Sequence, residues 1–141
     1  MQKQNDIGPR VNVEQASRHA GSSADLWVMG WRIENLGANP IQLLTARLPH
    51  SRFRSGETEL KGCPRLLPGE NVRLELSVTC RESPGNVVEN AFLILHALWL
   101  ERPWRILARL RVVFDEKGAP ETVTELVTTQ AVGFSKAQES E

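Results

Sequence analysis

Apolar and polar residues alternate at every position of the stretch Val72-Arg73-Leu74-Glu75-Leu76-Ser77-Val78-Thr79. Successive side chains of a β-strand point to opposite faces, so this pattern predicts a strand with one buried and one solvated face. The residues just before it, Leu67-Pro68-Gly69-Glu70, favour a tight turn. Alternation of this kind dominates the chain and helical spacing is nearly absent, which predicts an all-β fold.

A second strand is expected over residues 26–34, and its polar positions decide which way it faces. Arg32 and Glu34 should point to water. Because side chains alternate along a strand, the inward set is then Trp27, Met29, Trp31 and Ile33. The sequence therefore predicts that two of the four tryptophans belong to the core.

The other segments before residue 65 are assigned from the same pattern. Residues 35–40, Asn-Leu-Gly-Ala-Asn-Pro, are typical of a turn, and a strand is expected over 41–48. Residues 49–64 are polar and contain glycine, which indicates a long connection with room for one short edge strand. Val11 and Val13 indicate a weaker strand near the N-terminus.

The longest expected element is a hairpin over residues 91–114, with Glu101-Arg102-Pro103 in its turn. An even loop that sets Trp99 opposite Trp104 gives the hairpin one wholly apolar face, whereas a three-residue loop would flip one arm. The apolar face is Leu93, Leu95, Ala97, Trp99, Trp104, Ile106, Ala108 and Leu110. The opposite face, which we call the arginine face, is Phe92, Ile94, His96, Leu98, Arg105, Leu107, Arg109 and Arg111.

The C-terminal segment 121–134 fits two interpretations. Its Thr and Val content favours a strand, whereas Val123, Leu126 and Val127 have helical spacing. We expect a single domain over residues 10–134, with a flexible N-terminus over 1–9 and a disordered tail over 135–141. The expected architecture is an antiparallel β-sandwich of about seven to eight strands.

Two short motifs carry a resemblance to a known class of domains. One is Arg32-Ile33-Glu34-Asn35-Leu36-Gly37-Ala38-Asn39-Pro40-Ile41, and the other is Leu67-Pro68-Gly69-Glu70-Asn71-Val72-Arg73-Leu74. With the hairpin they cover residues 26–114, and this span resembles bacterial immunoglobulin-like sandwich domains of the adhesion-associated type. The resemblance implies an immunoglobulin-like fold and a non-catalytic accessory or binding role, often in exported proteins. The chain departs from the pattern in its doubly apolar hairpin and in lacking an export signal.

Composition limits the function classes further. The chain has 141 residues with 17 basic and 17 acidic side chains, so no overall field attracts nucleic acid or an anionic membrane. Residues 1–6 lack the apolar core of a secretory signal, and the apolar run 91–100 is about half of the ~20 residues that a membrane span needs. We therefore expect a cytoplasmic protein without membrane contact, in which Cys63 and Cys80 are free thiols.

No group of residues in the sequence has the spacing of a catalytic or metal site. His19, His50 and His96 lie far apart and form no ligand pair. The sequence contains neither a nucleophile elbow nor a glycine-rich phosphate loop. We expect no enzymatic activity and no cofactor.

The arginine face decides the expected function. Monomers seldom expose large apolar patches, so Phe92, Ile94 and Leu98 need a cover. Either the chain supplies it, through segment 121–134 or a central strand packed on both sides, or a protein partner or second copy docks there, oriented by the arginines. The expected function is a non-catalytic interaction module that associates through the hairpin sheet, residues 91–114.

Two other functions, glycan or small-molecule binding and nucleic-acid binding, fit part of the sequence. Trp99 and Trp104 lie near the hairpin turn, and aromatic rings stack on sugars, so the alternative is a glycan or small-molecule binding module that uses this end and the adjacent loops. Arginines also contact phosphates, but neither a lysine nor an interleaved exposed aromatic residue accompanies these three. Nucleic-acid binding is therefore disfavoured.

Overall fold

The computed structural model describes residues 8–133, which form nine strands and no helix. The strands are β1 (Val11–Ala20), β2 (Leu26–Asn35), β3 (Ile41–His50), β4 (Phe53–Glu59), β5 (Arg65–Leu66), β6 (Asn71–Thr79), β7 (Val87–Trp99), β8 (Arg102–Phe114) and β9 (Pro120–Ala131). They pair antiparallel in the order β1-β2-β6-β4-β3-β7-β8-β9, and β5 pairs with β3. The described residues therefore contain no helix that could span a membrane.

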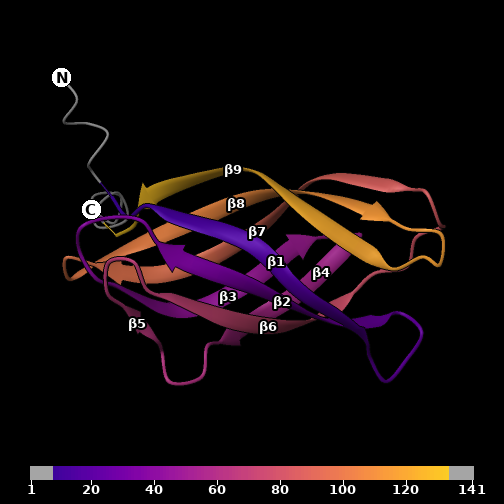
Figure 1. Ribbon diagram of the computed structural model, residues 1–141, viewed down its shortest axis with the longest axis horizontal. Coiled ribbons are helices and arrows are strands. Elements are labelled where there is room, and N and C mark those ends of the chain that lie inside the picture. Colours follow the sequence, from indigo (N-terminus) through magenta and orange to yellow (C-terminus); the bar gives the residue numbers. More distant parts are fainter. Residues whose placement is uncertain (1–7, 134–141) are drawn as a thin grey trace, which may run out of the picture.

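All strands belong to one sheet, which curls until its two terminal strands lie side by side. Figure 1 shows β1 and β9 next to each other across the front of the molecule. No ladder of main-chain hydrogen bonds joins these two strands in residues 8–133, so the sheet forms a nearly closed barrel. The prediction of an all-β antiparallel fold is confirmed, but the strand order gives one curled sheet where two packed sheets were expected.

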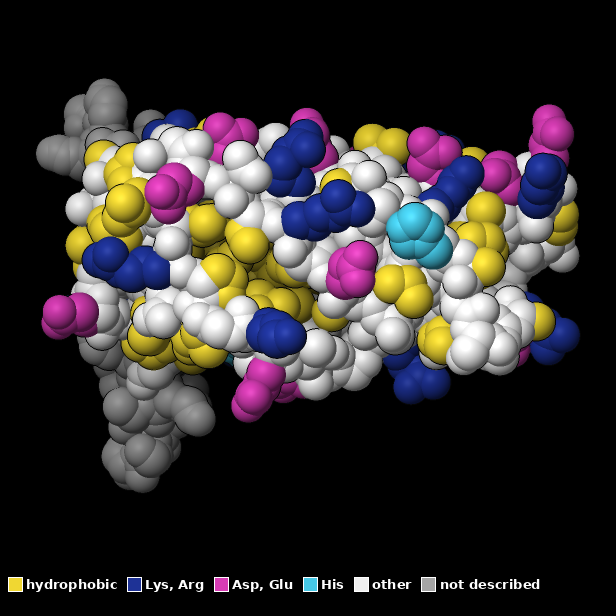
Figure 2. Space-filling view, turned by 60° about the horizontal axis from the view of Figure 1, so that its bottom comes forward, with side chains coloured by type: hydrophobic (Ala, Val, Ile, Leu, Met, Phe, Trp, Pro, Cys, Tyr) yellow, Lys and Arg dark blue, Asp and Glu magenta, His cyan; other side chains and the backbone are white. Residues whose placement is uncertain are grey.

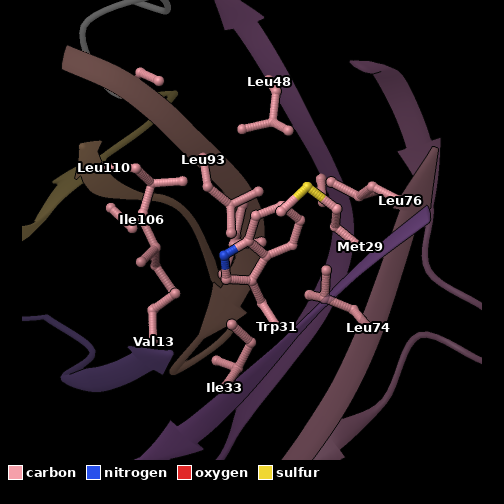
Figure 3. Close-up of a cluster of buried hydrophobic side chains, with 14 of the residues drawn as sticks. Val13, Met29, Trp31, Ile33, Leu48, Leu74, Leu76, Leu93, Ile106 and Leu110 are labelled. Atoms are coloured by element: carbon pink, nitrogen blue, oxygen red, sulfur yellow. The ribbon is translucent and has the colours of Figure 1, made fainter. Parts of the chain in front are cut away.

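The inward side chains of every long strand meet in one core. In β6, Leu74, Leu76 and Val78 are at most 5% exposed, and the residues between them are exposed, as the alternation predicts. On β2, Met29, Trp31 and Ile33 are fully buried. Figure 3 shows the Trp31 indole among the side chains of Met29, Ile33 and Leu93.

The hairpin of β7 and β8 has the predicted faces but a different register. Ala97 pairs with Trp104 and Trp99 pairs with Arg102, two residues away from the predicted alignment. The turn consists of Leu100 and Glu101 alone, with φ of 51° and 63°, the left-handed pair of a tight two-residue hairpin turn. Because the shift is two residues and side chains alternate with period two, every residue keeps its predicted face.

Two segments differ from the expected assignment. Residues 49–64 contain β4, which lies between β3 and β6 inside the sheet and is not a short edge strand. Its buried residue Phe53 packs edge-on against Trp31, with ring centroids 6.5 Å apart and planes at 85°. Segment 121–134 is a strand as far as Ala131 and extends the sheet beside β8.

The N-terminal segment was expected to be flexible over residues 1–9. Gly8 and Pro9 are buried, and a Cβ atom added to Gly8 would lie 2.8 Å from the Trp104 ring. Residues 1–7 lie outside the described part of the chain, as do Phe134 and the expected tail 135–141.

Candidate functional site

The arginine face lies on the outside of the barrel, on the two longest strands. His96 pairs with Arg105, Ile94 with Leu107, and Phe92 with Arg109, so the eight predicted residues lie together in adjacent rows. Ile94 is 7% exposed, and the other seven are partly exposed. The predicted residues therefore form one surface in which apolar and cationic side chains alternate.

Strand β9 widens this surface and does not cover it. Its main chain pairs with the free edge of β8, which places Val123 beside Arg111 and Leu126 beside Arg109. Val123 and Leu126 are 55% and 49% exposed, although both are large and apolar. The sequence did not identify Val123 and Leu126 as site residues, because it left open whether segment 121–134 is a strand or a helix. The Thr and Val content of this segment, which favours a strand, was the signal that could have placed them on the sheet.

The arginines cover part of the apolar surface with their own side chains. Arg111 Nε lies 3.1 Å from Glu89 Oε2, and Arg105 Nη1 donates to Gln130 Oε1 at 3.2 Å. Arg109 Nε lies 3.7 Å from Glu125 Oε1, which is an ion pair too long for a hydrogen bond. Exposed pairs of this kind contribute ~0–1 kcal/mol each. Their main effect is to hold the aliphatic stems across the apolar rows while the charged ends reach water.

The two tryptophans of the alternative function do not form a flat platform. Their rings meet edge to face, with centroids 5.6 Å apart and planes at 85°. Trp104 is buried at 7% exposure, and Trp99 is partly buried against the core. Sugar stacking needs an accessible ring face, so this geometry leaves at most part of Trp99 for that purpose.

Charges of both signs are interspersed on the part of the surface that Figure 2 shows, with hydrophobic side chains visible in a hollow between them. On the side of the molecule that Figure 2 shows, no extended positive patch of the kind that binds nucleic acid is visible. Among residues 8–133, no three His, Cys, Asp or Glu side chains lie close enough to hold a metal ion. Cys63 and Cys80 are both free thiols.

The end of the barrel away from the hairpin turn carries a second polar group of residues. Arg52 donates through Nη2 and Nε to the two carboxylate oxygens of Glu82, at 2.8 and 3.0 Å, and Asn86 donates to the same carboxylate at 3.0 Å. These bonds lower the pKa of Glu82 from 4.5 to about 2. Burial raises the pKa of the nearby Cys80 thiol to about 11, so it stays protonated and unreactive at neutral pH.

We expect the Glu82 ion pair to make stability depend on acid pH. The folded-state pKa lies below the unfolded value, so the contribution is complete above pH 4.5 and is lost as pH falls toward 2. The urea midpoint of the protein should therefore fall more between pH 6 and pH 3 than that of Glu82→Gln, which has no charge to lose. Equal falls in the two proteins would show that Glu82 is not a source of acid sensitivity.

Comparison with known proteins identifies no family for this chain. No protein-family model and no curated protein matches the chain. A solved structure that matches the chain is the X-ray structure of Northeast Structural Genomics Consortium target SoR45, which is 15% identical. The match covers 92% of this chain and 89% of that one, with a TM-score of 0.28.

Proposed function

We propose that the chain is a non-catalytic interaction module that binds a second copy of itself through the arginine face, extended by Val123 and Leu126. The observation that carries this proposal is the exposure of those two side chains beside the apolar rows of β7 and β8. Within residues 8–133 the arginine stems cover this apolar surface only in part, and exposed apolar surfaces of this kind mark interaction sites.

The charges on the same surface favour a second copy over an unrelated partner. In a two-fold symmetric interface the same patch faces itself, so a patch that carries both signs can satisfy itself. Here the arginines are interspersed with Glu89 and Glu125. Within residues 8–133, Arg105 donates to the neutral amide of Gln130 and to no carboxylate, so it is available to a carboxylate of the other copy.

The size of the surface and the family resemblance support the same class of function. Stable interfaces bury roughly 800 Å² on each partner, which is about a tenth of the 8053 Å² exposed by this protein. We expect the proposed interface on three adjacent strands to bury an area of that order. The resemblance of residues 26–114 to bacterial immunoglobulin-like domains implies non-catalytic accessory or binding modules as well.

Sedimentation velocity at rising protein concentration tests the proposal. We expect the protein to form dimers and Leu126→Glu to weaken dimerisation at least tenfold, because the substitution places a charge in the apolar row. Leu126 is half exposed, so this change should leave the fold intact. Leu67→Glu is the matched control, since Leu67 is similarly exposed at 43% but lies on the turn between β5 and β6, outside the three strands that carry the arginine face.

Two results would contradict the proposal. The first is a protein that stays monomeric up to hundreds of micromolar. The second is a dimer that Leu126→Glu and Leu67→Glu leave equally strong, which would place the interface elsewhere.

A further inference from the structure

The seam between β1 and β9 is held together by side chains at one end. Gln15 Oε1 accepts hydrogen bonds from the main-chain N–H and the hydroxyl of Thr122, at 2.6 and 2.8 Å. The Trp31 indole N–H also donates to the Thr122 hydroxyl, at 3.2 Å. Nearby, Arg18 donates to the carbonyl oxygen of Pro120 at 3.1 Å. These side chains replace the main-chain ladder that would close the barrel.

The opposite end of the seam is held by close packing. Gly8 lies against the Trp104 ring and against Thr129 on β9, where an added Cβ atom would come within 3.1 Å of the Thr129 hydroxyl. The two terminal strands are thus held together at one end of their contact, and the segment just before β1 packs against β9 at the other. Between these points no main-chain ladder joins them.

A groove of about 560 Å³ occupies this middle region, lined by residues 12–15 of β1 and 121–127 of β9. A second hollow of about 260 Å³, lined in part by residues 8–11 and 127–129, continues it along the same two strands. A volume of this size lies within the range of ligand-binding clefts, ~300–1,000 Å³. The Thr124 hydroxyl lines the groove and is buried without a hydrogen-bond partner.

Main-chain N–H and C=O groups of β9 that do not bond to β8 point toward the groove. Asp115 N–H donates to the carbonyl oxygen of Ala119, so these two residues form a hydrogen-bonded pair between β8 and β9. Hydrogen-bonded and non-bonded pairs alternate along an antiparallel ladder, so this one pair assigns the pairs that follow it. That alternation directs the N–H and C=O of Thr122 and Thr124 away from β8. The N–H of Thr122 is bonded to Gln15, as this orientation requires. Thr124 presents the next donor and acceptor along the same edge.

We propose that this groove takes an extended polypeptide segment of another protein, which adds as a strand to the β9 edge at Thr124. An extended main chain matches this site because it supplies a donor and an acceptor at the spacing of the exposed edge. A side chain that points toward the barrel would be small and polar, since it meets the Thr124 hydroxyl.

The charges that line the groove favour basic residues at the positions of the bound segment that point away from the barrel. Three glutamates, Glu14, Glu121 and Glu125, line the groove, and neither lysine nor arginine does. Each glutamate already lies 2.8–3.7 Å from an arginine of the sheet, so they favour basic residues at defined positions without adding much affinity. The expected ligand alternates basic residues with small polar ones over about five residues, which extend ~17 Å along the strand.

Selection of a phage-displayed random heptapeptide library on the immobilised protein tests this proposal. We expect enriched peptides that alternate Lys or Arg with Ser, Thr or small residues. A synthetic copy of the most enriched peptide should bind at least tenfold more weakly to Thr124→Pro, which removes the N–H that points away from β8. Thr124→Val keeps that N–H and is the matched control, with binding reduced less.

Hydrogen exchange gives a second measurement that does not depend on the proline variant folding. The bound peptide should slow exchange of the Thr124 amide and leave amides on the arginine face unchanged. The proposal is overturned if no peptide is enriched, if the peptide binds Thr124→Pro and the unsubstituted protein equally, or if Thr124 exchange is unaffected. Enriched peptides that lack basic residues would overturn the assigned role of the glutamates.

Discussion

The Trp31→Ala variant is expected to lose about 3–5 kcal/mol of the free energy of unfolding, the range for deleting a fully buried aromatic side chain. Trp31 is 0% exposed and packs edge to face against Phe53. Its indole N–H also donates to Thr122 on β9, so its removal weakens both the core and the seam between the terminal strands. Chemical denaturation followed by circular dichroism measures the loss.

Trp31→Phe separates the two contributions. The phenyl ring retains most of the packing and loses the hydrogen bond, so its cost should be about 1–3 kcal/mol. Trp27→Ala is the matched tryptophan control, because Trp27 lies on the same strand and is only partly buried. A loss from Trp31→Ala no larger than that from Trp27→Ala would contradict the placement of Trp31 in the core.

Asn35→Ala is expected to lose about 2–4 kcal/mol, because one side chain holds three main-chain groups in place. The Asn35 amide donates to the carbonyl oxygens of Asn39 and Leu66, at 2.9 and 3.0 Å, and its oxygen accepts from the Gly37 N–H at 2.9 Å. Asn35 is 1% exposed, so water cannot readily replace these bonds. The same denaturation experiment measures the loss.

Asn71→Ala is the control for this variant, since Asn71 begins β6 with an exposed side chain. It should change stability by less than about 0.5 kcal/mol, as is usual for surface substitutions. Equal losses at the two positions would mean that Asn35 does not organise the turn between β2 and β3.

The sequence predicted those parts of the fold that depend on local alternation. The faces of β2, β6 and the hairpin follow from period-two spacing, and all three are as predicted. Asn35-Leu36-Gly37 was recognised as a turn, and the Asn35 side chain explains why it forms one. Strand β4 was missed as an internal strand because its outer residues are polar, and only Phe53 and Ser55 point to the core.

Pairing between distant strands could not be predicted in the same way. The hairpin register depends on whether Leu100 and Glu101 adopt the left-handed conformation, which non-glycine residues seldom do. The contact between β1 and β9 depends on the curl of the whole sheet, to which every strand contributes. For the same reason, sequence analysis did not find the groove beside Thr124.

The pairing of the two strands that brings the residues of the arginine face together was predicted, whereas the position of segment 121–134 was left open. One hypothesis placed segment 121–134 over Phe92, Ile94 and Leu98. In the structure this segment is β9, which pairs with the β8 edge and adds Val123 and Leu126 to the same surface. The proposal that a second copy supplies the cover rests on that arrangement.

Isotope-filtered nuclear Overhauser spectroscopy on a mixture of labelled and unlabelled protein tests this central proposal most directly. It detects only contacts between different copies of the chain. We predict intermolecular contacts from the methyl groups of Ile94, Leu107 and Leu126, and none from Leu67. Intermolecular contacts confined to other surfaces, or their complete absence at millimolar concentration, would contradict association through the arginine face.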